Sequence, residues 1–172
     1  MASAPVVVIG VGNALRADDA AGVLVARRLR PRAGVEIREQ SGEATALLEA
    51  LRGRAAALIV DAAAGAEPGR LHRLDAAAEP LPQGLFGCST HGFGLAEGIE
   101  LARALGALPG ACVVYALEGA QFATGAAMSA AVVGALEALA SRVDAELDLL
   151  VRDELLRART AGSGWASRPA SP

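Results

Sequence analysis

Three runs of apolar residues are continuous enough to form strands buried on both faces of a sheet. They cover residues 6–9, 55–60 and 111–117. Residues 35–39 alternate between apolar and charged side chains, which predicts a fourth strand with Val35 and Ile37 on one face. Residues 69–74 alternate over a shorter length and predict an edge strand. The pattern therefore gives five candidate strands.

Between these strands, apolar residues recur every three or four positions, which predicts amphipathic helices. The helical segments run from the residues after Asp19 to Leu29, over 43–51, over 95–105, and from an N-cap at Ser129 to about Arg157. Strands that alternate with helices form parallel units with right-handed crossovers. We therefore expect a three-layer α/β/α sandwich with a mostly parallel five-stranded sheet. It forms a single domain over residues 1–158, and residues 159–172 are expected to be a disordered tail because they are mostly Gly, Ser, Pro and Ala.

The stretch after the first candidate strand combines glycines with two aspartates. Gly10 and Gly12 permit a tight turn, and Asp18 and Asp19 precede the first candidate helix. Gly-x-Gly also begins the dinucleotide-binding fingerprint, but Leu15 stands where that fingerprint has its third glycine. Two carboxylates at a helix N-terminus repel the pyrophosphate that free N–H groups otherwise attract. The pair favours a cation instead, with Asp18 expected as the N-cap of the helix and its neighbour as a ligand or base.

Polar residues also follow other candidate strands. Asp61 ends the third strand, Glu118 ends the last, and His91 lies in a long loop over residues 76–93. Ligands of open α/β sheets bind outside the carboxyl ends of the strands, so these side chains are expected near Asp19. Two carboxylates and one imidazole there suit a divalent metal with open coordination positions. Each also has a structural alternative: Asp61 can cap a turn, His91 can bond to its own loop, and Glu118 can be a hydrogen-bonded strand end.

Other residues with reactive or titratable side chains have a weaker claim to function. Glu39 ends a strand about where a dinucleotide enzyme has its ribose-binding acid, and His72 alternates with leucines and is expected to be solvated. Cys88 lies three residues before His91, so a Cys–His nucleophile pair is conceivable, although such partners usually come from distant segments. Cys112 lies in an apolar strand and is expected to be a small core residue.

The composition narrows the class of protein. The 172 residues are 53% hydrophobic but only 3% aromatic, so Ala, Val and Leu must fill the core. The net charge is −3 and basic residues do not cluster, which argues against nucleic acid as a partner. Two cysteines are too few for a disulfide framework or a cysteine zinc site. No signal segment and no membrane-spanning run is apparent, so a cytoplasmic protein is expected.

Three motifs resemble the hydrogenase maturation endopeptidases of nickel–iron hydrogenases. The first is G-x-G-N-x-L-x-x-D-D-x-x-G over residues 10–22, the second is Asp61-Ala62 at a strand end, and the third is S-T-H-x-x-G-L over residues 89–95. The order and spacing extend from about Val6 to the final helix. Two positions depart from the family: Ala20 replaces a common glycine, and Leu117 replaces a common proline, which weakens any role for the following glutamate.

The resemblance implies a phosphorylase/hydrolase-like fold and an aspartyl endopeptidase activity. Such enzymes remove a C-terminal extension from the hydrogenase large-subunit precursor after nickel insertion, and are thought to recognise the nickel. By motif, the family's metal-contacting positions fall on Asp19, Asp61 and His91, which are also the catalytic candidates. The resemblance further implies that the precursor supplies the nickel, that no nucleotide cofactor or membrane takes part, and that the protein is a monomer or weak homodimer.

The chemistry leaves the role of the ion open. A divalent ion lowers the pKa of bound water and polarises a carbonyl, and a carboxylate not fully used as a ligand, from Asp19 or Asp61, can act as general base. The ion can also be only what the protein recognises. The alternatives are a non-catalytic metal-sensing scaffold or chaperone for the precursor, a dinucleotide-binding enzyme, and a general aminopeptidase or esterase.

Overall fold

The structure is a computed structural model that describes residues 5–82, 84–86 and 94–163, with side chains up to residue 158. The strands are β1 (Val6–Val11), β2 (Val35–Gln40), β3 (Ala56–Ala64), β4 (Leu71–Asp75) and β5 (Ala111–Gly119). The helices are α1 (Ala21–Arg28), α2 (Ala44–Leu51), α3 (Leu95–Ala104) and α4 (Ala130–Ser163), with a 3₁₀ turn, η1 (Ala17–Ala20), before α1.

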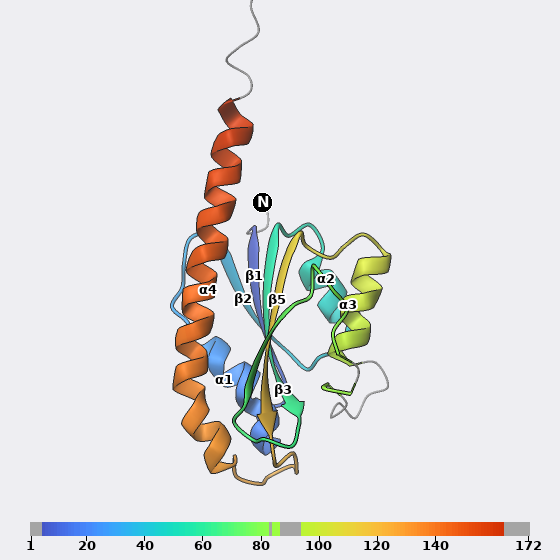
Figure 1. Cartoon of the computed structure of the whole chain (residues 1–172), viewed down its shortest axis with the longest axis vertical. Helices are drawn as coiled ribbons and strands as arrows, with labels where there is room; N and C mark the ends of the chain where they lie inside the picture. The colour runs from blue at the N-terminus through green and yellow to red at the C-terminus, as the bar shows by residue number, and fades with distance from the viewer. Residues whose placement is uncertain (1–4, 83, 87–93, 164–172) are drawn as a thin grey trace, which may run out of the picture.

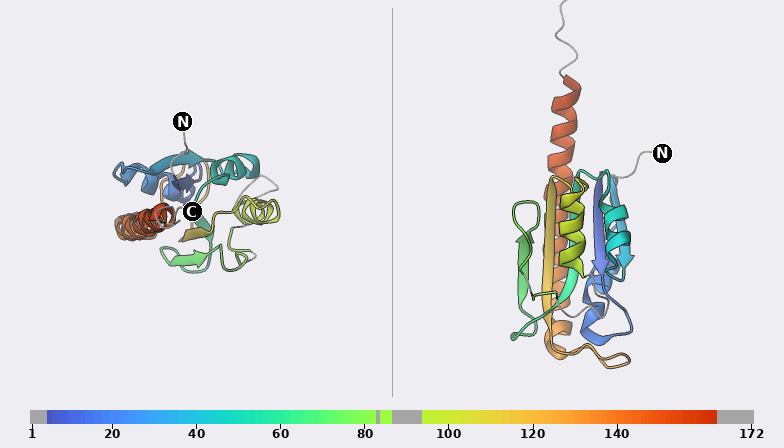
Figure 2. Two further views of the ribbon diagram at one scale, coloured as in Figure 1. Left: turned by 90° about the horizontal axis from the view of Figure 1, so that it is seen from above. Right: turned by 90° about the vertical axis from the view of Figure 1, so that its right-hand side faces the viewer.

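The five strands form one sheet in the order β2-β1-β3-β5-β4. Four strands are parallel, and β4 pairs antiparallel with β5 at one edge (Figure 2). α1 and α4 cover one face, and α2 and α3 cover the other (Figure 1). The predicted α/β sandwich with its mostly parallel sheet and its edge strand is therefore confirmed. The carboxyl ends of the parallel strands meet at one edge of the sheet, where η1 begins.

The core is built from small and branched side chains on both faces of the central strands. On β1, Val6 and Val8 pack toward α1 and α4, whereas Val7 and Ile9 pack toward α2 and α3. Gly22 brings α1 very close to the sheet, since a Cβ on it would lie 2.2 Å from the carbonyl oxygen of Val60. This close packing fixes the position of η1, which immediately precedes α1.

Two elements extend beyond their predicted ends. β3 continues to Ala64, so Asp61 lies inside the strand rather than at its end. Ala62, Ala63 and Ala64 pair with the end of β5, and this pairing extends β3. The low strand propensity of alanine does not predict this extension. α4 continues to Ser163, past the predicted end near Arg157 and into the predicted tail, because residues 154–163 include no proline.

Among the described helices, none combines the length and apolar character needed to cross a membrane.

Candidate active site

η1 directs its alanines and its two aspartates to three different sides. A 3₁₀ helix has about three residues per turn, so Ala17 and Ala20 share one side while Asp18 and Asp19 point to two others. Gly12 lets the glycine loop lie directly against this turn. It has a φ of 135°, and a Cβ there would lie 1.8 Å from the carbonyl oxygen of Asp19. One short turn thus determines where both carboxylates of the motif lie.

The prediction that Asp18 is the N-cap of the first helix is wrong. Arg16 precedes η1 and Ala20 precedes α1, and neither helix start has a side-chain cap. The Asp18 carboxylate is fully buried and accepts four hydrogen bonds from residues 120–129. The donors are the N–H groups of Ala120 (2.7 Å), Gln121 (2.9 Å) and Ser129 (2.7 Å) and the hydroxyl of Ser129 (2.8 Å). Burial raises the pKa of Asp18, but these bonds outweigh burial and hold the pKa below its usual value.

The same arrangement explains the start of the last helix. The Ser129 hydroxyl, which donates to Asp18, also accepts from the N–H of Val132 at 3.5 Å. Ser129 is therefore at the N-cap position before α4, as predicted. Asp18 joins the N-terminal end of α4 to η1.

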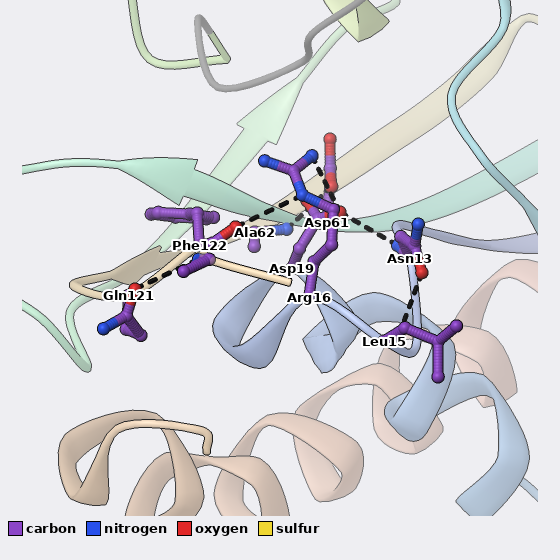
Figure 3. Close-up of polar contacts among 9 residues, drawn as sticks. Asn13, Leu15, Arg16, Asp19, Asp61, Ala62, Gln121 and Phe122 are labelled. Atoms are coloured by element: carbon purple, nitrogen blue, oxygen red, sulfur yellow. Dashed lines mark hydrogen bonds and ion pairs between the residues drawn. The ribbon is translucent and has the colours of Figure 1, made fainter. Parts of the chain in front are cut away.

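Asp19 points from η1 toward the glycine loop and is only partly exposed (Figure 3). Its Oδ2 accepts a hydrogen bond from the N–H of Asn13 at 3.0 Å and lies 3.7 Å from Nη1 of Arg16. Arg16 also donates from Nε to the carbonyl oxygen of Phe122 at 3.2 Å. Arg16 was not among the predicted site residues, although a cation three residues before an acidic candidate is a signal that the sequence contains.

Asp61 is 8% exposed and accepts a hydrogen bond from the N–H of Ala62 at 2.8 Å (Figure 3). Burial and then the charge of Asp19 raise its pKa to about 7, while the Ala62 N–H opposes the shift. Among the described residues, no arginine forms an ion pair with Asp61. The structure therefore brings two of the three predicted site residues together, and the charge of Asp19 disfavours the ionised form of Asp61.

This environment fits a cation in terms of donor chemistry. Carboxylate oxygens suit divalent metals, and a positive charge between Asp19 and Asp61 would relieve their repulsion and the desolvation of Asp61. No group of three or more metal-binding side chains occurs within the described parts of the chain. The third predicted ligand, His91, lies outside the described residues, as does Cys88.

His72 and Glu118 form a hydrogen-bonded pair, with 2.6 Å between Nε2 and Oε1. Glu118 is 5% exposed, and its other oxygen accepts from the N–H of Glu67 at 2.8 Å. The hydrogen bond from the Glu67 N–H, followed by that with His72, holds the pKa of Glu118 below its usual value. The prediction that His72 is simply solvated is wrong, because it crosses between strands to a buried carboxylate.

This pair is a neighbour of Asp61 in the sheet. Asp61 pairs with Ala116 of β5, and Ala116 pairs with His72 of β4. Paired residues on adjacent strands point to the same face, so Asp61 and His72 share a face with one alanine between them.

The residues that suggested a dinucleotide enzyme make structural contacts with other parts of the fold. Glu39 forms a two-bond ion pair with Arg27, at 2.8 and 2.7 Å. The glycine loop packs against η1 rather than opening around a phosphate. Cys112 is fully buried in β5, as predicted, and burial raises the pKa of its thiol to about 12.

Comparisons with known proteins agree with this fold. A family model described as hydrogenase maturation protease matches residues 24–146. The chain belongs to the hydrogenase maturation protease family. Members of this family are peptidases, so this protein is a peptidase. No curated protein sequence matches the chain.

Solved structures of this family share the architecture. The nickel–iron hydrogenase maturation protease HycI from Thermococcus kodakarensis KOD1 is 25% identical, with a TM-score of 0.63 over 84% of this chain and 93% of that one. The hydrogenase maturating endopeptidase HybD from E. coli is 22% identical, with a TM-score of 0.66 over 87% and 93%. An endopeptidase from Escherichia coli is 24% identical, with a TM-score of 0.67 over the same shares. At such identities the E. coli structures support the fold alone.

Proposed function

We propose that this peptidase removes the C-terminal extension of a nickel–iron hydrogenase large-subunit precursor after nickel has been inserted. Asp19, Asp61 and His91 recognise the nickel, which belongs to the precursor and arrives with it. The family supports the class of substrate. The nickel requirement rests on the chemistry of the acidic pair.

The observation that carries the proposal is the charge arrangement around Asp61. A buried carboxylate beside another carboxylate is unfavourable in the free protein, and burial together with Asp19 raises its pKa to about 7. A divalent ion carried by the substrate offsets this unfavourable negative charge, and a precursor without the ion does not. Nickel-loaded precursor therefore binds more tightly than nickel-free precursor, which makes nickel insertion a condition for cleavage.

The same carboxylates suit peptide hydrolysis. A carboxylate that the nickel does not occupy can act as general base. In the proposed step, the carboxylate left free by nickel takes a proton from an attacking water. The water oxygen bonds to the scissile carbonyl carbon, the C–N bond breaks, and the proton passes to the leaving amine.

Arg16 is placed to stabilise the negative charge that develops on the oxygen of the scissile carbonyl. Its Nε is held by the carbonyl oxygen of Phe122 at 3.2 Å, and its Nη1 lies 3.7 Å from Asp19. A guanidinium fixed on both sides is a preorganised donor, and such donors contribute strongly to catalysis where charge develops.

The deciding experiment incubates the purified protein with nickel-loaded and with nickel-free cognate precursor and follows both by intact mass. Loss of a C-terminal peptide from the nickel-loaded form alone is the expected result. Cleavage of both forms would remove nickel recognition from the proposal but keep the peptidase. Cleavage of neither would overturn this substrate.

Two variants in the same assay distinguish a role of the acidic pair in cleavage from a general effect of removing a carboxylate. Asp61→Asn keeps the shape of the side chain and its acceptor for Ala62, and we expect it to abolish cleavage of the nickel-loaded precursor. Asp153→Asn changes an exposed carboxylate on α4 and serves as the matched control, with cleavage expected at the wild-type rate. Full activity of Asp61→Asn would contradict the role assigned to the acidic pair.

A further inference from the structure

Leu15 belongs to the opening motif but does not pack in the core. Its side chain is 72% exposed. Its backbone is nonetheless held at both ends, because its N–H donates to Oδ1 of Asn13 and its carbonyl accepts from the N–H of Gly125, both at 2.9 Å. Removing a leucine side chain from water is favourable, and this side chain forgoes that gain in the free protein. A leucine held rigidly in solvent is suited to contact another molecule.

Leu15 borders a groove of about 540 Å³ between the glycine loop, α1 and the N-terminal end of α4. Ala17 and Ala20 of η1 form part of its lining, and Val133, 55% exposed, lies on the α4 side. The volume falls in the range of roughly 300–1,000 Å³ that is usual for binding sites. Alanines and glycine keep the groove open, and its lining is mostly apolar.

The groove is separated from the acidic pair by a single turn of chain. Ala17 and Ala20 face the groove, while Asp19 of the same turn points to the glycine loop and Asp61. Figure 3 shows the Leu15 side chain directed away from these carboxylates. A polypeptide that passes over η1 can therefore reach both places at once.

Arg28 is the charged residue among those that line the groove. Its Nη1 donates to the carbonyl oxygen of Leu24 at 2.9 Å, and no ion pair joins it to another described residue. The neighbouring Arg27, in contrast, is bound by both oxygens of Glu39. The groove thus combines apolar walls with a positive charge available to a carboxylate.

We propose that this groove binds the C-terminal extension that the protease removes, with apolar side chains against Leu15 and Val133 and a carboxylate against Arg28. The inference rests on the proposed function, since it takes the precursor as substrate. The occupant follows from charge and position: the extension is a polypeptide that ends in a carboxylate, and it must lie next to the acidic pair to be cut there. The acidic site then recognises whether the precursor carries nickel, and the groove binds the C-terminal extension of the precursor.

Steady-state cleavage of nickel-loaded precursor tests the groove. Leu15→Ser and Arg28→Gln are each expected to raise KM about tenfold and to change kcat little, because a binding contact worth about 1.4 kcal/mol is lost. Leu155→Ser and Arg52→Gln are the matched controls. Leu155 is 62% exposed on the far part of α4, Arg52 is exposed after α2, and both variants are expected to keep the wild-type KM.

Photo-crosslinking gives a readout that does not depend on turnover. p-Benzoylphenylalanine is placed at position 15 or, as a control, at position 155, in an otherwise wild-type protein, which is irradiated with nickel-loaded precursor immediately after mixing. Mass spectrometry is expected to find crosslinks from position 15 to the extension and none from position 155. The mature large subunit, which lacks the extension, is expected to give no crosslink from position 15.

The outcomes separate the two proposals. Wild-type cleavage together with an unchanged KM for Leu15→Ser and no crosslink to the extension overturns the groove alone. Crosslinks that map to the body of the large subunit also overturn it, because the groove would then hold a different segment. Absence of cleavage by the wild-type protein overturns the proposed function and this inference together.

Discussion

At the scale of single residues, Asp18 of η1 and Asp61 of β3 have opposite electrostatic roles. Asp18 is buried and satisfied by four hydrogen bonds, so its charge stabilises the fold. Asp61 is buried near Asp19 and accepts from the N–H of Ala62, and burial together with the charge of Asp19 makes its ionised form unfavourable. The first carboxylate is therefore structural, and the second is available for function.

This contrast predicts how Asp61→Asn changes the free energy of unfolding. The folded pKa of about 7 lies above the unfolded value of 3.8, so wild-type stability falls as pH rises between these values. Asparagine removes that penalty, and a shift of about three pKa units corresponds to about 4 kcal/mol. We expect the variant to gain stability over wild type as pH rises from 4 to 8, by up to that amount, in denaturant unfolding of the metal-free protein.

The control for this measurement is Asp153→Asn, whose exposed side chain lies on α4. It is expected to change the free energy of unfolding by less than about 0.5 kcal/mol at either pH. A stability difference between Asp61→Asn and wild type that is the same at pH 4 and pH 8 would show that the Asp61 carboxylate does not titrate abnormally.

Asp18→Asn is expected to act in the opposite direction. The amide group places a donor where the carboxylate accepts from three backbone N–H groups and a hydroxyl, and hydrogen bonds to a charged group contribute about 1.5–3 kcal/mol. The variant should lose stability by about 2–4 kcal/mol near neutral pH, and hydrogen exchange over residues 120–129 should speed up. Because its pKa is lowered, the Asp18 contribution present above the unfolded pKa is lost as pH falls through the folded pKa.

Unchanged exchange at residues 120–129 in Asp18→Asn would contradict this account of Asp18. The partners also explain why the sequence did not predict it. They lie more than a hundred positions away. Three of the four donors are backbone N–H groups, and the fourth is a serine hydroxyl with no distinguishing sequence pattern. The approach of Asp19 to Asp61 was predictable, because both follow from the rule that parallel strands end at one edge.

At the scale of elements, the apolar patterns placed the strands and α-helices of the described residues but not all of their ends. Alternation and continuous runs identify buried strands because only the sheet interior can accept them. The extension of β3 through Ala62, Ala63 and Ala64 depends on its pairing with β5, which is tertiary information. The 3₁₀ turn η1 was not predicted, since the close packing of Gly12 on Asp19 shapes it.

The edge strand gives a prediction at this scale. His72 of β4 bonds to Glu118 of β5, and Glu118 also holds the turn that contains Glu67. His72→Phe keeps the ring but loses this bond, so we expect a lower Tm and faster hydrogen exchange in β4, with β2 at the opposite edge unaffected. The comparison is made by thermal unfolding and exchange mass spectrometry on wild type and variant.

A double-mutant cycle identifies the cause. If the pair stabilises β4, adding Glu118→Gln to His72→Phe should lower Tm by less than the sum of the two single effects, because both changes break the same contact. Additive effects would mean that His72 and Glu118 act independently on the edge strand.

At the scale of the whole molecule, the candidate site and the last turns of α4 lie at opposite ends. η1, the acidic pair and the groove beside Leu15 lie where the parallel strands end, near the start of α4, whereas the far part of α4 extends beyond the opposite end of the sheet (Figure 1). Leu155 and Leu156 on this far part are 62% and 53% exposed. The contacts that position the site therefore do not depend on the last turns of α4.

A chain that ends after Arg157 tests this separation. We expect it to cleave nickel-loaded precursor at a rate within about twofold of wild type, and to unfold at nearly the same temperature, because residues from 158 onward follow the packed part of α4. The control, Leu147→Ala, removes a fully buried side chain from that packed part and should lower the free energy of unfolding by about 2–5 kcal/mol. Loss of cleavage by the shortened chain without loss of stability would mean that the far end of α4 contacts the precursor, so that recognition spans the length of the molecule.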